Sequence, residues 1–180
     1  QDFSFTGTGE IGDRIWFDRD GSGSATQDAG EPGLPLIPVT VTWAGPDGVF
    51  GNADDVSYAT TTDANGAYQV DHLPFGSYQV TVDTSSSAFP AGVVPTYDAD
   101  GIATVHTSSL TLTEASPKNL DQDFSYTGTA SLGDRVWLDQ NGDGVQDPDE
   151  HGIPGIGVVV TFLGADGVPG GGDDIVFTTT

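Results

Sequence analysis

The part of the chain with the clearest chemical signature is an acidic loop, DQNGDGVQDPDE, at residues 139–150. It matches in full the calcium-loop pattern D-x-[DN]-x-[DN]-G-x5-E. Alternate positions of such a loop direct oxygen atoms inward, the glycine allows a sharp turn, and the final glutamate binds the cation through both carboxylate oxygens. The loop therefore predicts a calcium site with these ligands: Asp139, Asn141, Asp143, the carbonyl oxygen of Val145, Asp147 and Glu150.

Residues 18–31 repeat this pattern in a looser form. Gly23 stands in register with Gly144, but a two-residue insertion moves the last two acidic positions farther along the chain. The neutral side chain of Ser22 takes a ligand position, so we expect weaker calcium binding than at 139–150, or a rearranged geometry. The candidate ligands are Asp18, Asp20, Ser22, Asp28 and Glu31.

Smaller groups of acidic residues stand beside glycines elsewhere. One group at 47–55 recurs at 166–174, and a D-A-D-G fragment occupies 98–101. Glycines between paired acids let a loop fold back so that its carboxylates converge, which predicts one or two additional calcium sites. Asp and Gly also favour turns for backbone reasons alone, so a simple turn is the alternative interpretation. The residues concerned are Asp47, Asp54, Asp55, Asp98 and Asp100, with Asp166, Asp173 and Asp174 in the second copy of the first group.

The charge balance narrows the classes of partner. The chain has 27 acidic residues against 4 Lys and Arg, which gives a net charge of −23. Nucleic acid and anionic membrane surfaces would be repelled, because binding them requires basic side chains. A solubilising acidic surface is one explanation of this charge, and clusters that hold divalent cations are another. The uneven spacing of the acids favours the cations.

The cysteine and methionine counts, both 0, also bear on where the protein works. Without disulfides or thiolate-bound zinc, an extracellular domain needs another means of stabilising its fold, and a bound metal ion is the obvious one. The sequence contains no signal peptide and no membrane-spanning run. We expect a mature or excised piece of a secreted or cell-surface protein, with no direct insertion into a membrane.

The chain repeats itself. Residues 2–18 (DFSFTGTGEIGDRIWFD) match 123–139 (DFSYTGTASLGDRVWLD), and residues 33–61 match 152–180. We expect one complete unit at 9–128, the last strand of a preceding unit at 1–8, and the opening half of the next unit at 129–180. Either the chain continues and completes this half unit, which we favour, or another chain completes it. Tandem units with so little linker predict an elongated array in which neighbours pack end to end.

Short runs of alternating apolar and polar residues predict the elements that position these loops. We expect strands at 10–17, 38–44, 56–62, 67–70, 77–82, 102–112 and 120–126, with a strand at 135–138 leading into the second loop. About seven short strands joined by turns predict an all-β sandwich of two sheets. Trp16, Trp43 and Trp137 lie in alternating strands, which favours the core over a role as ligand-stacking platforms.

These segments together resemble the SdrD B-like domains of serine–aspartate repeat proteins. The resemblance rests on GDRVWLDQNGDGVQDPDEHGIPG, on GADGVPGGGDD and on TTTDANGAYQVDHLPFGSYQVTVD, and it covers nearly the whole chain. It implies a Greek-key β-sandwich of the Cna-B or prealbumin-like type, stabilised by calcium and strung into rods on bacterial surface proteins. It also implies that the rod is a spacer that projects a separate binding head.

Nothing in the sequence predicts catalysis. The chain has no Cys nucleophile and no G-x-S-x-G motif, and His72, His106 and His151 are widely separated, each expected on an exposed loop or strand. We therefore expect a protein that is not an enzyme.

Two functions fit the sequence. The first is a calcium-stabilised stalk, spacer or filament segment whose partners are neighbouring units or filament subunits, with any host or cell-surface ligand bound by the separate head. We expect the loop at 139–150 to lie near the junction between units and to help fix their angle. The alternative is an adhesin module that itself binds carbohydrate or a host protein, through exposed aromatic side chains or an open position on calcium.

Overall fold

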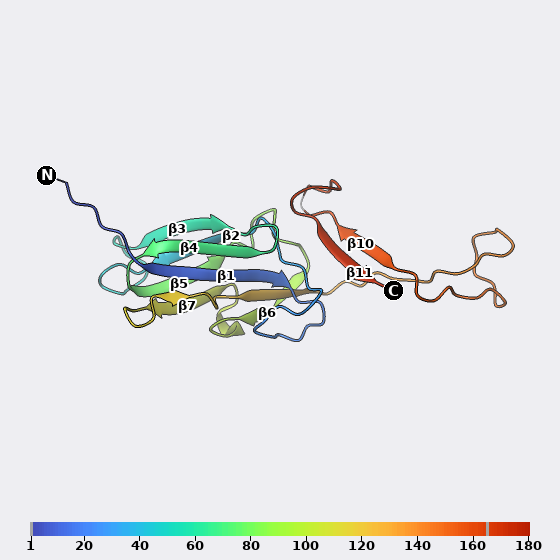
Figure 1. Ribbon diagram of the computed structural model, residues 1–180, viewed down its shortest axis with the longest axis horizontal. Helices are drawn as coiled ribbons and strands as arrows, with labels where there is room; N and C mark the ends of the chain where they lie inside the picture. The colour runs from blue at the N-terminus through green and yellow to red at the C-terminus, as the bar shows by residue number, and fades with distance from the viewer. Residues whose placement is uncertain (1, 165) are drawn as a thin grey trace.

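A computed structural model describes residues 2–164 and 166–180, and nearly all of its regular structure is β (Figure 1). The residues expected to alternate do form strands. The elements in chain order are β1 (Gly9–Phe17), β2 (Pro38–Trp43), β3 (Val56–Thr61), β4 (Ala67–Leu73), β5 (Gly76–Val82), β6 (Val93–Asp98), the short 3-10 helix η1 (Ile102–Thr104), β7 (Thr107–Leu112), β8 (Lys118–Asn119), β9 (Phe124–Gly128), β10 (Val158–Phe162) and β11 (Ile175–Thr179).

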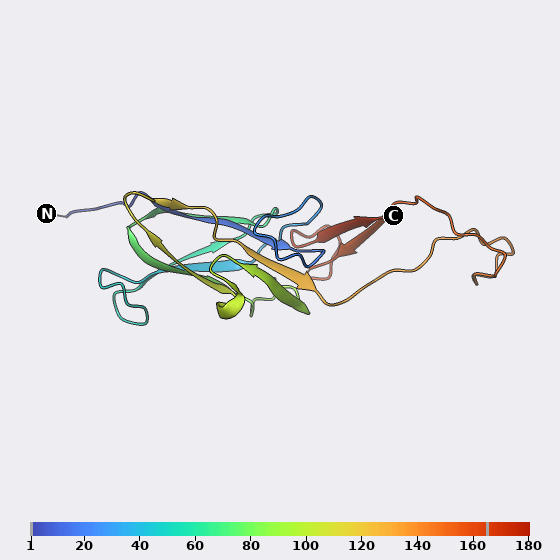
Figure 2. The same cartoon turned by 90° about the horizontal axis from the view of Figure 1, so that it is seen from below.

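The strands of the first unit form two sheets that pack face to face (Figure 2). One sheet has the order β4-β1-β9-β6, with β8 also paired to β1, and the other has the order β3-β2-β5-β7. Strand β1 is antiparallel to β4 and parallel to β9, with Ile15 opposite Phe124. The parallel pair has a consequence for the site, because the loop that follows β1 and the chain that leaves β9 lie at the same end of the unit.

The core lies between the two sheets and follows from the period-two pattern of the strands. In β2, Val39 and Val41 are buried while the Thr residues between them are only half-buried, and β5 repeats this alternation. Trp16 is 1% exposed and Trp43 packs partly buried against the core, so the prediction that they are core residues is confirmed for both. A stacking platform at Trp16 is excluded, because no ligand can reach a buried ring.

Two strands begin several residues later than expected, and one strand was not predicted. Residues 102–104 form a 3-10 turn, so the strand expected at 102–112 begins only at Thr107, and the strand expected at 120–126 begins at Phe124. The sequence pattern missed β6, which contains Pro95. Proline is compatible with this strand because β6 lies at the edge of its sheet and pairs only with β9, so the missing amide leaves no ladder partner unsatisfied.

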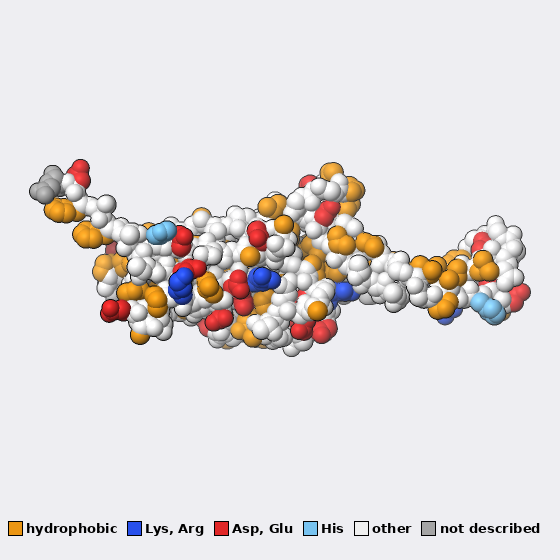
Figure 3. Space-filling model, in the orientation of Figure 1, with side chains coloured by type: hydrophobic (Ala, Val, Ile, Leu, Met, Phe, Trp, Pro, Cys, Tyr) orange, Lys and Arg blue, Asp and Glu red, His pale blue; other side chains and the backbone are white. Residues whose placement is uncertain are grey.

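The second unit is represented by the hairpin of β10 and β11, which pair antiparallel. The strand expected at 135–138 is wrong, since only an isolated bridge joins Trp137 to Gly152 there. In the first unit the corresponding strand is β1, held between β4 and β9, and residues 129–180 contain no counterpart of those two partners. Apolar side chains accordingly remain exposed on the hairpin, Val159 at 65% and Val176 at 51% among them (Figure 3).

Two further observations concern the ends of the chain and its surroundings. Residues 2–8 lie outside the strands, so their assignment to the last strand of a preceding unit stays a prediction. Among the described residues, no helix has the length and apolar character needed to cross a membrane.

Candidate calcium-binding loops

The loop after β1 is organised around one buried carboxylate. Asp18 is 1% exposed, and its Oδ1 accepts hydrogen bonds from the amides of Gly21 at 2.8 Å and Ser22 at 3.2 Å, while Oδ2 accepts one from Gly23 at 3.0 Å. Gly21 and Gly23 have φ of 68° and 63°, a conformation that glycine adopts without strain. The two glycines therefore let the chain wrap around the Asp18 carboxylate.

A second carboxylate closes this loop. Glu31 Oε1 accepts a hydrogen bond from the Arg19 amide at 2.9 Å, and Oε2 accepts one from the Asp28 amide at 3.0 Å. Carboxylate oxygens of Asp18, Asp20 and Glu31 lie within 4.8 Å of one another, and among the described residues these are the only three acids that converge so closely. Carboxylate oxygens are the ligands that hard cations prefer, and this group supplies three of them.

The electrostatics of Asp18 keep it ionised. Burial acts to raise the pKa of its carboxyl, but the amide hydrogen bonds and the Thr96 hydroxyl outweigh burial and lower that pKa below its usual value. The loop therefore presents negative charges in a confined space, where they repel one another unless a cation balances them.

The loop at 139–150 has the same framework. Asp139 Oδ1 accepts from the Gly142 amide at 2.7 Å and Oδ2 from the Gly144 amide at 2.9 Å. Glu150, 6% exposed, accepts from the Gln140 amide at 2.7 Å and, through its other oxygen, from the Asp147 amide at 3.1 Å. Each of these contacts has its counterpart in the first loop.

The base of each loop is closed in the same way. Phe17 N donates to Pro32 O and Leu34 N to Ile15 O in the first loop, at 2.8 and 2.9 Å. The corresponding pairs at the second loop are Leu138 N to His151 O and Ile153 N to Val136 O, at 3.1 and 2.8 Å. The two-residue insertion of the first loop lies between these fixed points, so Glu31 takes the position that Glu150 has in its twin.

The interior of the second loop differs from the first. Asn141 Nδ2 donates to Asp143 Oδ2 and to Asp147 Oδ2, at 3.0 Å each. Asp143 Oδ1 also accepts from the Val145 amide at 2.8 Å. Two of the predicted ligands, Asp143 and Asp147, thus meet at the Asn141 amide, although no three carboxylates of this loop converge as closely as those of the first. In the first loop, the Asp28 carboxylate does not belong to the converging group. Asp28 contacts that group only through its backbone amide, which donates to Glu31.

The smaller acidic groups at 47–55 and 166–174 also share a geometry. Asp55 Oδ2 accepts from the Gly51 amide and Asp174 Oδ2 from the Gly170 amide, both at 2.7 Å. Within the described part of the chain, Oδ1 of both aspartates is buried and has no hydrogen-bond partner. The first acid of each group also accepts a backbone hydrogen bond, Asp47 from Val49 N at 2.9 Å and Asp166 from Val168 N at 2.7 Å. Asp54 is exposed, whereas its counterpart Asp173 is only 9% exposed.

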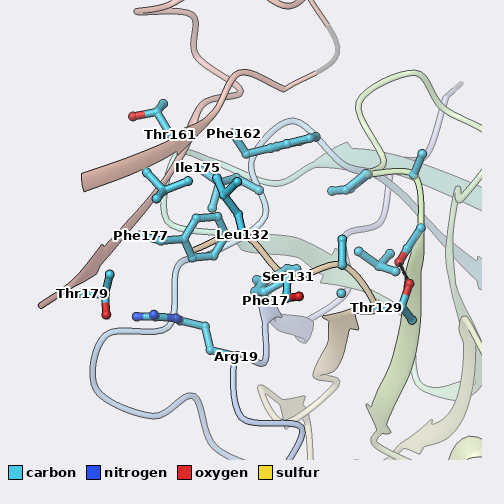
Figure 4. Close-up of a pocket in the computed structure, with 17 residues that line it drawn as sticks. Phe17, Arg19, Thr129, Ser131, Leu132, Thr161, Phe162, Ile175, Phe177 and Thr179 are labelled. Atoms are coloured by element: carbon cyan, nitrogen blue, oxygen red, sulfur yellow. Dashed lines mark hydrogen bonds between the residues drawn. The ribbon is translucent and has the colours of Figure 1, made fainter. Parts of the chain in front are cut away.

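The first loop also forms the junction with the second unit. Arg19 directly follows Asp18, and its guanidinium lies over the Phe177 ring of β11 at 5.6 Å (Figure 4). Both terminal nitrogens also donate to Thr178 O at 3.5 Å. The rings of Phe17 and Phe177 meet edge to face at 5.2 Å, and Ile175 beside them is 3% exposed. The hairpin of the second unit therefore packs against the loop end of the first.

This arrangement corrects the expectation about which loop lies at the junction. The loop at 139–150 projects from the far end of the second unit, while the loop at 18–31 faces the β10–β11 hairpin (Figure 1). The reason is the parallel pairing of β1 with β9 in the first unit, which brings the loop after β1 to the end from which the chain leaves for the hairpin.

The histidines divide into two kinds. His72 and His151 are exposed as expected, but His106 is only half-exposed. Its Nδ1 lies 3.1 Å from the Tyr126 hydroxyl and its ring stacks on Tyr126, so the expectation of an exposed residue is wrong there. No local signal indicates this contact, because Tyr126 belongs to a distant strand.

Comparisons with known proteins agree with this architecture. The model of the SdrD B-like domain family matches residues 9–126 and 130–169, and the chain belongs to this family. Relatives include serine-aspartate repeat-containing protein D of Staphylococcus aureus strain MW2, 34% identical over 153 residues, which are 85% of this chain and 11% of the relative. Protein E of strain MSSA476 is 36% identical over 83% of this chain and 12% of the relative. The chain thus spans about a tenth of the length of these relatives.

A search of solved structures found the full-length major pilin SpaD of Corynebacterium diphtheriae. It is 14% identical, with a TM-score of 0.43 over 71% of this chain and 34% of the pilin.

Proposed function

We propose that this chain is a calcium-stabilised structural repeat, a stalk, spacer or filament segment of an extracellular surface protein. The observation that supports this most is the pair of loops at 18–31 and 139–150. They differ in length and in half of their side chains, yet both hold one Asp and one Glu carboxylate by the same backbone amides. Fixed carboxylates in a glycine-containing loop are the arrangement that binds calcium.

Each loop offers enough oxygen for one calcium ion. In the first loop the converging carboxylates are those of Asp18, Asp20 and Glu31, with Ser22 and Asp28 nearby in the chain. In the second the ligands are the set predicted from the sequence, with Glu150 closing the shell. When bound there, the cation would balance carboxylates that otherwise repel one another, and it would tie the two ends of each loop together.

The role that follows is mechanical. The unit buries its aromatic core and joins its neighbour through the Arg19 and Phe177 contact, so its natural partners are other units of the same array or subunits of a filament. A separate head domain would bind host or cell-surface ligands. We propose that the chain works outside the cell and catalyses no reaction, in keeping with a sequence that has no Cys nucleophile and no G-x-S-x-G motif.

Calorimetric titration with calcium tests this proposal. Glu31→Gln and Glu150→Gln each keep the size of the side chain but remove the charge, so each variant should lose the calcium bound at its own loop. Asp149→Asn removes the same charge next to Glu150 at an exposed position, and it should titrate like the unchanged chain. Equal losses in Glu150→Gln and Asp149→Asn would show that calcium responds only to net charge, and the proposal would fail.

A further inference from the structure

One residue between the first acidic loop and β2 has a backbone conformation that its side chain disfavours. Leu36 has a φ of 58°, in the left-handed region, where the Cβ atom of an L-residue crowds the following carbonyl oxygen. The other described residues with a positive φ, glycines apart, are His72 and His106, and histidine is several times more frequent in this region than most residues. A strained leucine persists only where the surrounding structure holds it, and such strain often marks a functional position.

The turn that contains Leu36 is held firmly by one buried side chain. Pro35 and Leu36 form the centre of the turn, and a proline followed by a residue of positive φ is the order of a type II turn, which favours glycine at the second place. Thr62 Oγ1 donates to Leu34 O at 2.7 Å and accepts from Ile37 N at 2.8 Å. Thr62 O accepts from Leu36 N at 3.0 Å. Residues 34, 35 and 37 are buried, so Leu36 is the one exposed side chain of this turn.

The internal repeat shows that the turn does not require leucine. Gly155 occupies the equivalent position in the second unit, follows Pro154 in the same kind of turn and has a φ of 73°. Glycine adopts this conformation without strain, so the turn alone favours glycine at position 36. Leu36 is also 46% exposed, so it adds little to the core of its own unit. The reason for a leucine must therefore lie in what its side chain contacts outside that core.

The Leu36 side chain meets the second unit. Its Cδ1 lies 4.0 Å from the position that a Cβ atom would take on Gly172, in the loop that joins β10 to β11. This loop lies at the end of the hairpin nearer to the first unit (Figure 1). The loop is a firm surface, because Asp166 accepts from the Val168 amide and Asp174 from the Gly170 amide, both at 2.7 Å.

We propose that Leu36 is a positioning residue of the junction, which fixes the angle between the two units. The Arg19 guanidinium contacts the hairpin at Phe177 of β11, and Leu36 contacts it separately at Gly172. One contact leaves the hairpin free to turn about that point, whereas two separate contacts remove this freedom. A unit with glycine at this place of the turn offers its neighbour no such second contact. The inference rests on the proposed function as a repeat of an array, and it adds that the residue at this turn decides how stiffly a unit holds the next.

Distances between two spin labels, measured by pulsed electron paramagnetic resonance in millimolar calcium, test this proposal. The chain has no Cys, so labels attach only at the introduced pair Thr111→Cys and Val159→Cys, exposed positions with one in each unit. Leu36→Gly and Leu36→Asn both suit a positive φ but lose the contact, so each should widen the distribution of distances. Leu36→Met retains an apolar side chain of similar length and should leave the distribution as narrow as in the labelled parent.

A second measurement separates a loosened junction from a damaged fold. Leu36→Gly relieves the strain in the turn, so the first unit should melt no lower than in the parent chain. An unchanged distribution in Leu36→Gly would overturn the proposal, and so would a lower melting temperature, because leucine would then serve the fold of its own unit. Calcium binding does not enter this result: Glu31→Gln and Glu150→Gln test the proposed function by titration, and Leu36→Gly should titrate like the unchanged chain.

Discussion

Replacing Asp18 by Asn separates the two tasks of this side chain, which are to organise the loop and to bind calcium. The carboxylate accepts three backbone hydrogen bonds through two oxygens. The Asn amide offers a single oxygen, so at least the Gly23 amide or the Gly21 and Ser22 pair loses its acceptor. An unpaired buried donor costs about 1–3 kcal/mol, and the remaining bonds lose the strength that the charge gives them. We expect Asp18→Asn to lower the free energy of unfolding by about 2–4 kcal/mol without any calcium.

The calcium-binding task adds to this loss. A ligand that binds only the folded state stabilises it by about 2.7 kcal/mol when its concentration is one hundred times its Kd. We therefore expect the deficit of Asp18→Asn to grow by about 2–3 kcal/mol when millimolar calcium replaces EGTA.

Guanidinium unfolding of the full chain, followed by tryptophan fluorescence, measures both parts. The control is Asp71→Asn, which should unfold like the unchanged chain in both solutions. If Asp18→Asn unfolds like the unchanged chain in EGTA, the amide contacts of Asp18 do not hold the loop. If its deficit is the same in EGTA and in calcium, Asp18 is not a calcium ligand.

Further predictions concern the junction, the pH dependence and the core. Arg19→Ala removes the contact with Phe177 and Thr178, so the spread of maximum dimensions in small-angle scattering should widen while the melting temperature of the first unit stays nearly unchanged; an unaltered spread would show that Arg19 does not restrain the hairpin. Burial, together with the charges of Asp13 and Asp121, raises the pKa of Asp123 to about 6. Between pH of about 4 and 6 the folded state therefore holds a proton on Asp123 that the unfolded state releases. In EGTA, this group makes the free energy of unfolding fall as the pH rises through that range. Asp123→Asn should flatten that part of the stability profile, and an unchanged slope would contradict the assignment. Val41→Ala empties part of a fully buried position and should cost about 2–3 kcal/mol in equilibrium unfolding, whereas Thr42→Ala on the opposite face should cost under about 1 kcal/mol.

Much of the fold could be read from the sequence because its strands have one buried face. The alternation in 38–44 and 77–82 predicts β2 and β5 closely, since Val and Tyr at every second position must leave the solvent. Strand β6 escaped prediction because Pro95 argues against a strand, and only its place at the sheet edge makes it acceptable. Residues 135–138 failed for the opposite reason, because their pattern is right but they lack neighbouring strands to pair with.

The candidate site divides in a similar way. Spacing indicates Asp18 and Asp20, because the pattern fixes the order of the first ligands along a calcium loop. The two-residue insertion moves Glu31 out of that spacing, and its place became clear only from the hydrogen bonds that it shares with Glu150. The sequence does not predict which loop lies at the junction between units, because that position depends on the parallel pairing of β1 with β9. Arg19 carries no sequence signal for its contact with Phe177, as only the packing of one unit on the next brings them together.

Thermal unfolding with and without calcium tests the central claim most directly. The loop at 18–31, filled to about one hundred times its Kd, contributes about 2.7 kcal/mol to the first unit, and for a unit of this size each kcal/mol shifts Tm by about 3–5 °C. The main melting transition of the full chain in millimolar calcium should therefore lie about 10 °C above that of the same chain in EGTA at matched ionic strength. The Glu31→Gln, Glu150→Gln double variant should show only a small part of this difference. Equal melting temperatures of the unchanged chain in calcium and in EGTA would contradict the account, because calcium would then contribute nothing to holding this fold.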